Sequence, residues 1–542
     1  MRKRWKTWIA LGLACGLLAG CGQSPDEKAQ DGEAVSGEDA VGGESENPGT
    51  GTETGAPGAA DETSGQPESG QSTEEGSDMS QYDRMKVDTG TTYQTMESFG
   101  TSGAWWSQYV GGFEECVDDS GVSTREQIAT LLFDREAGIG LTCYRYNLGA
   151  GSAESRKGTY SDIHRRAQSF ETAPGVYDFT KDAGAVWFLE KATELGVEEV
   201  VLFCNSPLER LTDNGLAHLD KGMKSNLSPE NYQAFAAYVM DVAEHFVAEG
   251  IPVKFISPIN EPQWEWTGGQ EGAHYEPEQT TEVYLAFLDE LESRESLAGV
   301  KLSGPESGEW KGQAIDYTES LLKNQRLAAH FDTIDNHSYW SEAVDKESFR
   351  NYMKVYYPEV KLRASEWCEM VNGSDVTMDS AIHLSQEIAE DLRILSVVSW
   401  QNWVAVAPGG YRDGLIYIDE KSQKFRALKR LWSFGNYSRY VRPGYVRVDI
   451  EGDSRDLEKL LPTAFTGINE AGEEELVMVF VNEGTSSQEF VLEGCQGYER
   501  IAYYETSDAH DLECVLEEEW KQGPVTVPGR SVVTVILSRA NK

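Results

Sequence analysis

Basic residues are scarce in this sequence: 47 Lys and Arg face 91 Asp and Glu, for a formal net charge of −44. Proteins bind a phosphate backbone through basic side chains that replace its counterions, so nucleic acid is excluded as a ligand. Acidic polymers and anionic membrane surfaces are disfavoured for the same reason. With 542 residues, 39% of them hydrophobic, the chain is still long and apolar enough for two or three packed domains.

Several catalytic motifs are also missing. The sequence has no HExxH or grouped His and Cys spacing for a metal centre, no GxSxG elbow of a serine hydrolase and no Walker loop for a nucleotide. We therefore expect no metal and no cofactor. The apolar run near the N-terminus is too short to span a bilayer comfortably, and we expect contact with a membrane only through that end.

Residues 1–20 combine a basic start, an apolar run and small residues before a cysteine. This order is typical of a bacterial lipoprotein signal peptide, in which Leu18-Ala19-Gly20-Cys21 is the lipobox, cleavage precedes Cys21 and lipid is attached to its thiol. The alternative is an ordinary secretory signal followed by a chance cysteine. The lipobox predicts a protein anchored on the extracellular face of the bacterial cell membrane.

The segment that follows lacks the residues of a packed core. Residues 22–80 contain no aromatic residue, one lysine and fifteen Asp or Glu, among Gly, Ser, Thr and Pro. Such a segment cannot bury enough apolar surface to offset the entropy lost on ordering. We predict that residues 21–80 form a disordered acidic linker.

Cysteines are few. Beyond Cys21, six cysteines fall in the region expected to fold. Outside the cytoplasm they could pair, and Cys495 with Cys514 is the favoured bridge because both fall in one short all-β region. Buried free thiols are an equal alternative for Cys143, Cys204 and Cys368.

From residue 95 onward, β-branched or aromatic runs alternate with amphipathic runs that often end in glycine, the pattern of repeated βα units. The expected strands cover residues 98–106, 141–149, 198–207, 253–262, 300–307, 331–340, 360–370 and 395–404. Eight units predict a (β/α)₈ TIM barrel over residues 81–435. A doubly wound sheet is the rival fold, but no phosphate-binding glycine motif follows the first strand.

Past residue 435 the pattern changes to short alternating segments such as YVRVDIEG and ELVMVFVNEG. These predict a β-sandwich side domain over residues 436–542. A segment before the barrel, residues 84–95, could supply a further strand to it.

The active site of such a barrel lies at the carboxyl ends of its strands. Polar and aromatic residues gather there: Trp105, Trp106, Arg145, Asn205, Asn260, Glu261, His337, Tyr339, Glu366, Trp400 and Trp403, with Trp264 and Trp266 in the loop after strand four. Flat rings beside amides and carboxylates suit a sugar, whose C–H faces stack and whose hydroxyls form hydrogen bonds. The plain alternative is that the tryptophans only fill the barrel mouth.

Two glutamates end otherwise apolar strands. Glu261 ends strand four and Glu366 ends strand seven, and these strands face each other across a barrel mouth. Cleavage of a glycosidic bond uses two carboxyl groups, one that protonates the leaving oxygen and one that acts at the anomeric carbon. His337 is expected to donate hydrogen bonds and not to bind a metal.

The runs NSP at 205, ISPINEPQWEWTGGQEG at 256–272 and SEW at 365 resemble glycoside hydrolase family 30, a retaining family of barrel enzymes. The resemblance covers residues of about 95–540. It implies that Glu261 is the general acid/base and Glu366 the nucleophile. It also implies that Asn260 binds the 2-hydroxyl of the sugar and that Arg145, Tyr339 and Trp400 or Trp403 shape that subsite.

The substrate suggested by the resemblance is more specific. The continuation TGGQEGAHYE and the run YRYNLGAGS look most like the endo-β-1,6-galactanase branch, which attacks arabinogalactan side chains. Activities on β-1,6-glucan, β-xylan and glucosylceramide stay open, as does a catalytically silent glycan-binding lipoprotein. We expect a monomer that binds a polysaccharide or oligosaccharide.

Three further glutamates are weaker candidates. Glu265 lies in the loop after strand four, where it could line a subsite or be solvated, and Glu271 and Glu306 are expected to be structural or solvated.

Overall fold

A computed structural model describes residues 79–540, apart from residue 156 and residues 158–161. The predicted signal peptide, Cys21 and the predicted linker up to residue 78 lie outside the described residues. The described residues belong to one compact unit. Within the described ranges, no helix is both long and apolar enough to cross a bilayer.

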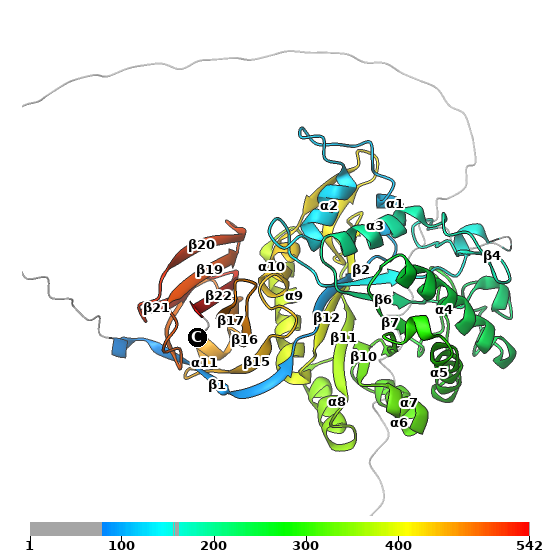
Figure 1. The fold of residues 1–542 in the computed structure, drawn as a ribbon. Helices are drawn as coiled ribbons and strands as arrows, with labels where there is room; N and C mark the ends of the chain where they lie inside the picture. The colour runs from blue at the N-terminus through cyan, green and yellow to red at the C-terminus, as the bar shows by residue number, and fades with distance from the viewer. Residues whose placement is uncertain (1–78, 156, 158–161, 541–542) are drawn as a thin grey trace, which may run out of the picture. The chain divides into compact units, whose positions relative to one another are not determined.

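A parallel sheet at the centre of this unit closes on itself as a barrel (Figure 1). Its strands are β2 (Ser98–Ser102), β3 (Cys143–Asn147), β6 (Glu199–Phe203), β7 (Val253–Ser257), β8 (Lys301–Leu302), β9 (Pro305–Ser307), β10 (Thr333–His337), β11 (Lys361–Trp367) and β12 (Ser399–Ala407). Hydrogen bonds join them in the order β8-β7-β6-β3-β2-β12-β11-β10-β9. All eight expected strand positions are found, and the predicted barrel is confirmed.

The fifth strand position is divided into β8 and β9. The first half pairs with β7 and the second with β10, so the broken strand closes the barrel. The break lies at Gly304, where a Cβ would fall 1.8 Å from the hydroxyl oxygen of Tyr284. That hydroxyl donates a hydrogen bond of 2.7 Å to the carbonyl of Ser303. Only glycine therefore fits at the break.

Helices cover the outside of the barrel. They are α1 (Ser107–Val110), α2 (Thr124–Phe133), α3 (Ala183–Glu194), α4 (Tyr232–Ala248), α5 (Pro277–Glu292), α6 (Gln313–Lys323), α7 (Gln325–His330), α8 (Ala343–Tyr356), α9 (Met378–Glu390) and α10 (Lys429–Ser438). In α4 the side chains of Phe235, Val239, Val242 and Phe246 recur every three or four residues and are all buried. This stripe packs the helix against the sheet.

Residues near the two ends of the described chain form a second sheet of nine strands. They are β1 (Asp83–Thr95), β15 (Val446–Gly452), β16 (Thr463–Ile468), β17 (Glu473–Asn482), β18 (Gln488–Glu493), β19 (Arg500–Thr506), β20 (Asp511–Glu519), β21 (Pro524–Val527) and β22 (Ser531–Ala540). Their order is β20-β19-β22-β17-β16-β15-β1-β18-β21. A short helix, α11 (Arg455–Glu458), follows β15.

This second sheet has a hydrophobic core of its own. Strands β17 and β18 are not neighbours in the order, yet the rings of Phe480 and Phe490 lie 5.3 Å apart. The sheet therefore curls over this core. Smaller strands complete the fold: β4 (Glu171–Ala173) pairs with β5 (Val176–Tyr177), and β13 (Gly414–Asp419) with β14 (Lys424–Ala427).

The favoured disulfide bridge between Cys495 and Cys514 is wrong, since both thiols are free. Cys514 lies on β20 at one edge of the nine-stranded sheet, whereas Cys495 follows β18 near the other edge. Membership of one β region did not place the two residues side by side. The equal alternative, buried free thiols, holds for Cys143, Cys204 and Cys368.

Helix α10 joins the barrel to the nine-stranded sheet, and Asn436 is the polar centre of that contact. Its side-chain nitrogen donates to the carbonyl of Tyr504 at 3.0 Å and to the hydroxyl of Thr534 at 2.9 Å. Its side-chain oxygen accepts from Thr506 at 2.7 Å. Asn436 is fully buried, so if its side chain is removed, no water reaches these partners to replace the lost hydrogen bonds.

We expect Asn436→Ala to lower the free energy of unfolding by about 2 kcal/mol, because it strands several buried polar groups. Chemical denaturation followed by circular dichroism measures the change. Asn351→Ala, at an exposed position of α8, is the control and should change the free energy by less than about 0.5 kcal/mol. Equal stability of both variants would contradict the role of Asn436.

Candidate active site at the barrel mouth

Glu261 and Glu366 both lie at the carboxyl end of the barrel and are both buried. Glu366 is the second-last residue of β11, and Glu261 lies four residues past β7. One carboxylate oxygen of each, together with a ring nitrogen of His337, forms a group of atoms that all lie within 4.8 Å of one another. The structure thus brings together the two glutamates that the sequence singled out.

Arg145 and Tyr339 hold the carboxylate of Glu366. Arg145 Nη1 donates to Glu366 Oε2 at 2.5 Å, and the Tyr339 hydroxyl donates to Oε1 at 3.1 Å. The other arm of the guanidinium donates to the side-chain oxygen of Asn260 at 2.9 Å. Arg145 also lies 3.8 Å over the ring of Phe203, so it is fixed from several sides. All four predicted polar residues therefore form one connected group.

Glu306, on β9, is a third carboxylate beneath this pair and has no exposed surface. It accepts hydrogen bonds from Ser257, at 3.0 Å, and from Ser365. Its oxygen Oε2 lies 3.4 Å from Arg145 and 3.2 Å from His337 Nε2. The backbone carbonyl of Glu306 accepts from the backbone N–H of Glu261 at 2.9 Å. Glu306 is therefore structural, as expected, but it is not solvated.

His337 lies between the three carboxylates. Its Nδ1 is 3.3 Å from Glu261 and 3.4 Å from Glu366, and its Nε2 faces Glu306. Neither ring nitrogen has the geometry of an aligned hydrogen bond, so these contacts are ion pairs. Burial lowers the pKa of His337, but the surrounding carboxylates outweigh it and raise the pKa to about 9. The ring is a cation at neutral pH.

The carboxylates respond to the same environment in different ways. Burial acts to raise the pKa of Glu306, but Arg145, His337 and Ser365 outweigh it and bring that pKa to about 2. Burial raises the pKa of Glu366, and the charge of Glu261 adds to this while His337 and Arg145 oppose it. The site therefore contains one permanent anion, Glu306, and a pair of glutamates in which the charge of Glu261 disfavours that of Glu366.

Glu261, His337 and Glu366 have residue types that could bind a metal ion. Two observations disfavour this. Arg145 already neutralises the charge of Glu366, at 2.5 Å. A metal ion would bind a ring nitrogen of His337 only without its proton, and the raised pKa of His337 keeps both nitrogens protonated. The donor set fits internal ion pairs better than a cation site.

Both Glu261 and Glu306 have a left-handed backbone, with φ of 44° and 59°. Non-glycine residues adopt this region rarely, at a cost of about 1–3 kcal/mol each, and such strain clusters at functional sites. The hydrogen bond from Glu261 N–H to the Glu306 carbonyl ties the two strained residues together.

Four predicted tryptophans lie at the mouth. The rings of Trp105 and Trp403 meet edge to face at 5.0 Å, and the guanidinium of Arg165 lies 4.2 Å over Trp105. Trp266 donates to the backbone carbonyl of Glu261 at 3.3 Å. Trp264 is exposed. It lies beside Glu261, because a Cβ on Gly308 would be 2.7 Å from Glu261 Oε1 and 3.2 Å from Trp264 Nε1.

Two predicted tryptophans are wrong as substrate contacts. Trp106 is buried against Phe188 of α3 and donates to the carbonyl of Ser102 at 2.9 Å. Trp400 has no exposed surface, packs on Phe434 of α10 and donates to Asp391 at 2.9 Å. Both side chains point outward into the helix layer. Alternation along β12 sends Trp400 and Trp403 to opposite faces, and the sequence alone did not fix which face was the inner one. Trp106 lies past the end of β2, at the start of α1, where strand alternation no longer applies.

The remaining predicted residues lie near the mouth in supporting positions. Asn205 is buried and donates to Asn147 at 3.0 Å. Glu265 is exposed on the loop after β7. Glu271 is buried and accepts hydrogen bonds from Ala150 and Ser152, which fastens that loop to the loop after β3.

Trp340, at the end of the sixth expected strand, and Gln263 were not among the predicted site residues, although both lie next to residues that were. Trp340 is exposed and meets Trp264 edge to face, with ring centroids 5.8 Å apart. Gln263 follows directly in the NEPQW run. An aromatic residue directly after the strand-six tyrosine was the available signal for Trp340.

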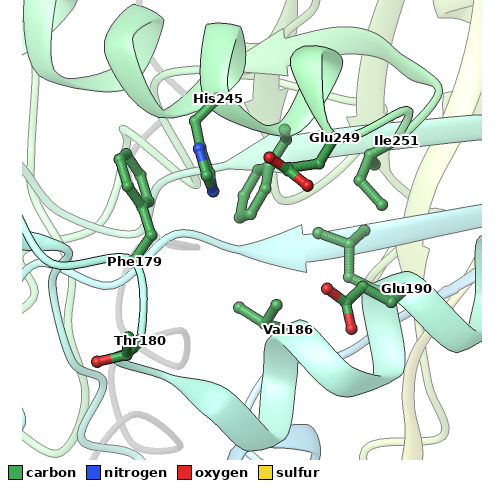
Figure 2. Close-up of a pocket in the computed structure, with 9 residues that line it drawn as sticks. Phe179, Thr180, Val186, Glu190, His245, Glu249 and Ile251 are labelled. Atoms are coloured by element: carbon green, nitrogen blue, oxygen red, sulfur yellow. The ribbon is translucent and has the colours of Figure 1, made fainter.

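A separate cavity of about 320 Å³ lies on the outside of the barrel between α3 and α4. Figure 2 shows Glu190 on α3 and Glu249 directly after α4 lining it, with Phe179 and His245 at one side. The ring of Phe179 stacks on His245 at 3.6 Å. None of the residues predicted for the site lines this cavity.

Comparison with known proteins supports the same interpretation as the geometry of the site. The family model described as O-Glycosyl hydrolase family 30 matches residues 82–417. An endo-beta-1,6-galactanase of Hypocrea rufa is 23% identical over 436 residues, which cover 74% of this chain and 81% of the relative.

Solved structures share the fold. A conserved exported protein from Bacteroides fragilis has a TM-score of 0.73 and 26% identity, over 83% of this chain and 99% of that one. The catalytic domain of a xylanase from Talaromyces cellulolyticus has a TM-score of 0.64 and 19% identity, over 84% of this chain and 100% of that one. The family match spans more than half of the chain, and the protein belongs to glycoside hydrolase family 30.

Proposed function

We propose that this family 30 hydrolase cleaves β-glycosidic bonds in a polysaccharide with retention of the anomeric configuration. The observation that carries the proposal is the spacing of the two carboxyl groups: one oxygen of Glu261 lies within 4.8 Å of one oxygen of Glu366. Retaining glycosidases keep their two carboxyl groups about 5–5.5 Å apart, whereas inverting enzymes leave room for a water molecule between them.

Glu366 is the nucleophile in this proposal. Its carboxylate attacks the anomeric carbon and forms a covalent glycosyl–enzyme ester while the bond to the leaving oxygen breaks. Arg145 at 2.5 Å and the Tyr339 hydroxyl at 3.1 Å stabilise the charged form and aim the attacking oxygen.

Glu261 is the general acid and base. It gives its proton to the leaving oxygen in the first step, then takes a proton from the water that attacks the ester and frees Glu366. Glu261 faces only His337 among the cations, while Glu366 also contacts Arg145. Glu366 is therefore the carboxyl group with the stronger cationic support, which suits the nucleophile, and Glu261 takes the part of the acid.

The other predicted residues complete the sugar site in this proposal. Asn260, held by Arg145 at 2.9 Å, binds the 2-hydroxyl group of the sugar that is cleaved. His337, Asn205, Trp105, Trp403, Trp264 and Trp266 form the walls.

The proposed substrate is the β-1,6-galactan side chain of arabinogalactan. The runs TGGQEGAHYE and YRYNLGAGS support it, as does the similarity to the Hypocrea rufa galactanase. The test is incubation with de-arabinosylated arabinogalactan, β-1,6-glucan and β-xylan, with sizing of the products. Faster release of reducing ends from either of the other glycans would assign the enzyme to that substrate. Binding without release from any of them would indicate a silent glycan-binding protein.

We further propose that lipid on Cys21 anchors the enzyme to the outer face of the bacterial membrane and that residues 21–80 tether it there. The nine-stranded sheet, curled over its own core, is proposed to be a β-sandwich side domain that works as part of a monomer.

Replacement of each carboxyl group should separate the two roles. We expect Glu366→Gly with azide to give the inverted α-glycosyl azide from an aryl β-galactoside, because azide enters from the side of the missing nucleophile. Glu261→Ala should lose about 10²–10⁴-fold in rate on the polysaccharide and give the retained β-azide from the aryl substrate. Proton NMR of the products shows the configuration.

The control for this pair is Glu265→Ala, at the exposed glutamate four residues past Glu261. This variant should form no azide product. The opposite configurations in the first two variants would exchange the two roles.

Glu306 should set the pH range of the reaction. With Glu306→Gln, Arg145 and His337 lose a neighbouring anion and stabilise the other two carboxylates more strongly. We expect the acid limb of the profile of kcat/KM against pH to move about 1 unit lower, because Arg145 and His337 then lower the pKa of Glu366 more strongly.

The matched control is Glu271→Gln, another buried glutamate of the mouth that touches none of the charged groups around Glu366. It should lower stability without moving the profile. An unchanged acid limb in Glu306→Gln would show that Glu306 only packs.

A further inference from the structure

Trp264 and Trp340 form an exposed aromatic corner beside Glu261. Their exposed fractions are 39% and 51%, high for the largest apolar side chain, and the rings meet edge to face. Trp340 is held in place by a left-handed backbone with φ of 51° and by Lys311, which donates to its carbonyl. Large apolar rings that are fixed and exposed mark a binding surface.

Gln263 gives the corner a polar floor. Both polar atoms of its amide are buried, and neither has a hydrogen-bond partner among the described residues. A Cβ on Gly308 would lie 2.7 Å from Gln263 Nε2, 2.7 Å from Glu261 Oε1 and 3.2 Å from Trp264 Nε1. Three polar atoms thus converge above a residue with no side chain. A buried amide without a partner is costly unless a ligand satisfies it.

We propose that Trp264, Trp340 and Gln263 form the subsite that holds the leaving sugar, a β-linked hexopyranose whose ring stacks on the tryptophans and whose hydroxyl groups bind the amide. This inference rests on the proposed function, because Glu261 must be the acid. The leaving oxygen meets that acid, so groups that gather around Glu261 lie beside the leaving sugar. Arg145 and Asn260, which surround Glu366, lie beside the sugar that is attacked.

The strand order gives the direction of the glycan. Trp105 and Trp403 follow or lie on β2 and β12, which are neighbours in the barrel. Trp264 and Trp340 follow β7 and β10, which flank the divided strand β8 and β9 on the opposite side. A chain bound by both aromatic pairs crosses the whole mouth with Glu261 and Glu366 beneath it. Such a cleft cuts within a chain and not only at its end.

The test compares two substrates that transfer the same β-1,6-galactobiosyl group and differ only in the leaving group: β-1,6-galactotetraose cut at its central bond, and β-1,6-galactobiosyl fluoride. Fluoride has no ring to stack and no hydroxyl to bind. For Trp340→Ala and Trp264→Ala, we expect kcat/KM on the tetraose to fall about tenfold or more, and on the fluoride to fall far less. Gln263→Met should lose about 3–10-fold on the tetraose by the same comparison.

Tyr356→Ala removes an aromatic ring, 65% exposed, from α8 and is the matched control for loss of an exposed ring. It should leave the ratio of the two kcat/KM values as in the unmodified protein. A parallel fall on both substrates in the tryptophan variants would overturn the subsite. If the unmodified enzyme cleaves neither compound, the proposed galactanase function fails, which is a different result.

Discussion

The mouth of the barrel buries two cations against three carboxyl groups. Arg145 and His337 supply the positive charge, and Glu306 is permanently negative. Arg145 contacts Glu306 and Glu366, and His337 contacts all three carboxyl groups. Buried charge without compensation is costly, so the carboxyl groups can lie this close together only because the two cations lie between them.

The barrel supplies the positions that this arrangement of charges needs. Arg145, His337 and Glu366 come from three separate parallel strands, whose ends meet at one edge of the sheet. Glu306 reaches the centre because the fifth strand breaks at Gly304 and resumes as β9, with its side chain turned inward. The left-handed backbone at Glu261 and Glu306 is strain that the surrounding hydrogen bonds sustain. Local distortion thus lies where regular strands alone could not bring the groups together.

Periodicity was enough to predict the eight strand positions, and strand ends were enough to predict that Glu261, Glu366, Arg145 and Tyr339 lie close together. The direction in which a side chain points was harder to predict. Trp106 and Trp400 lie in the same sequence runs as site residues, but their side chains pack against the helices outside the barrel. The place of Glu306 depends on a strand break that the Gly304-Pro305 dipeptide marks, although the prediction ran one strand through residues 300–307. The order of strands in the second sheet, which separates Cys495 from Cys514, depends on pairings distant in sequence.

Chemistry and substrate choice rest on different parts of the molecule. The charged groups lie on strands or within a few residues of them, where they are buried and bonded to one another, so a change in any one disturbs the rest. The aromatic corner at Trp264 and Trp340 lies on loops and is exposed, so its residues can change without upsetting the charge balance. A structure named for xylan accordingly shares this barrel fold. Under the proposed function, the residues at the strand ends break the glycosidic bond, and the exposed loop residues Trp264 and Trp340 contact the part of the glycan that distinguishes one substrate from another.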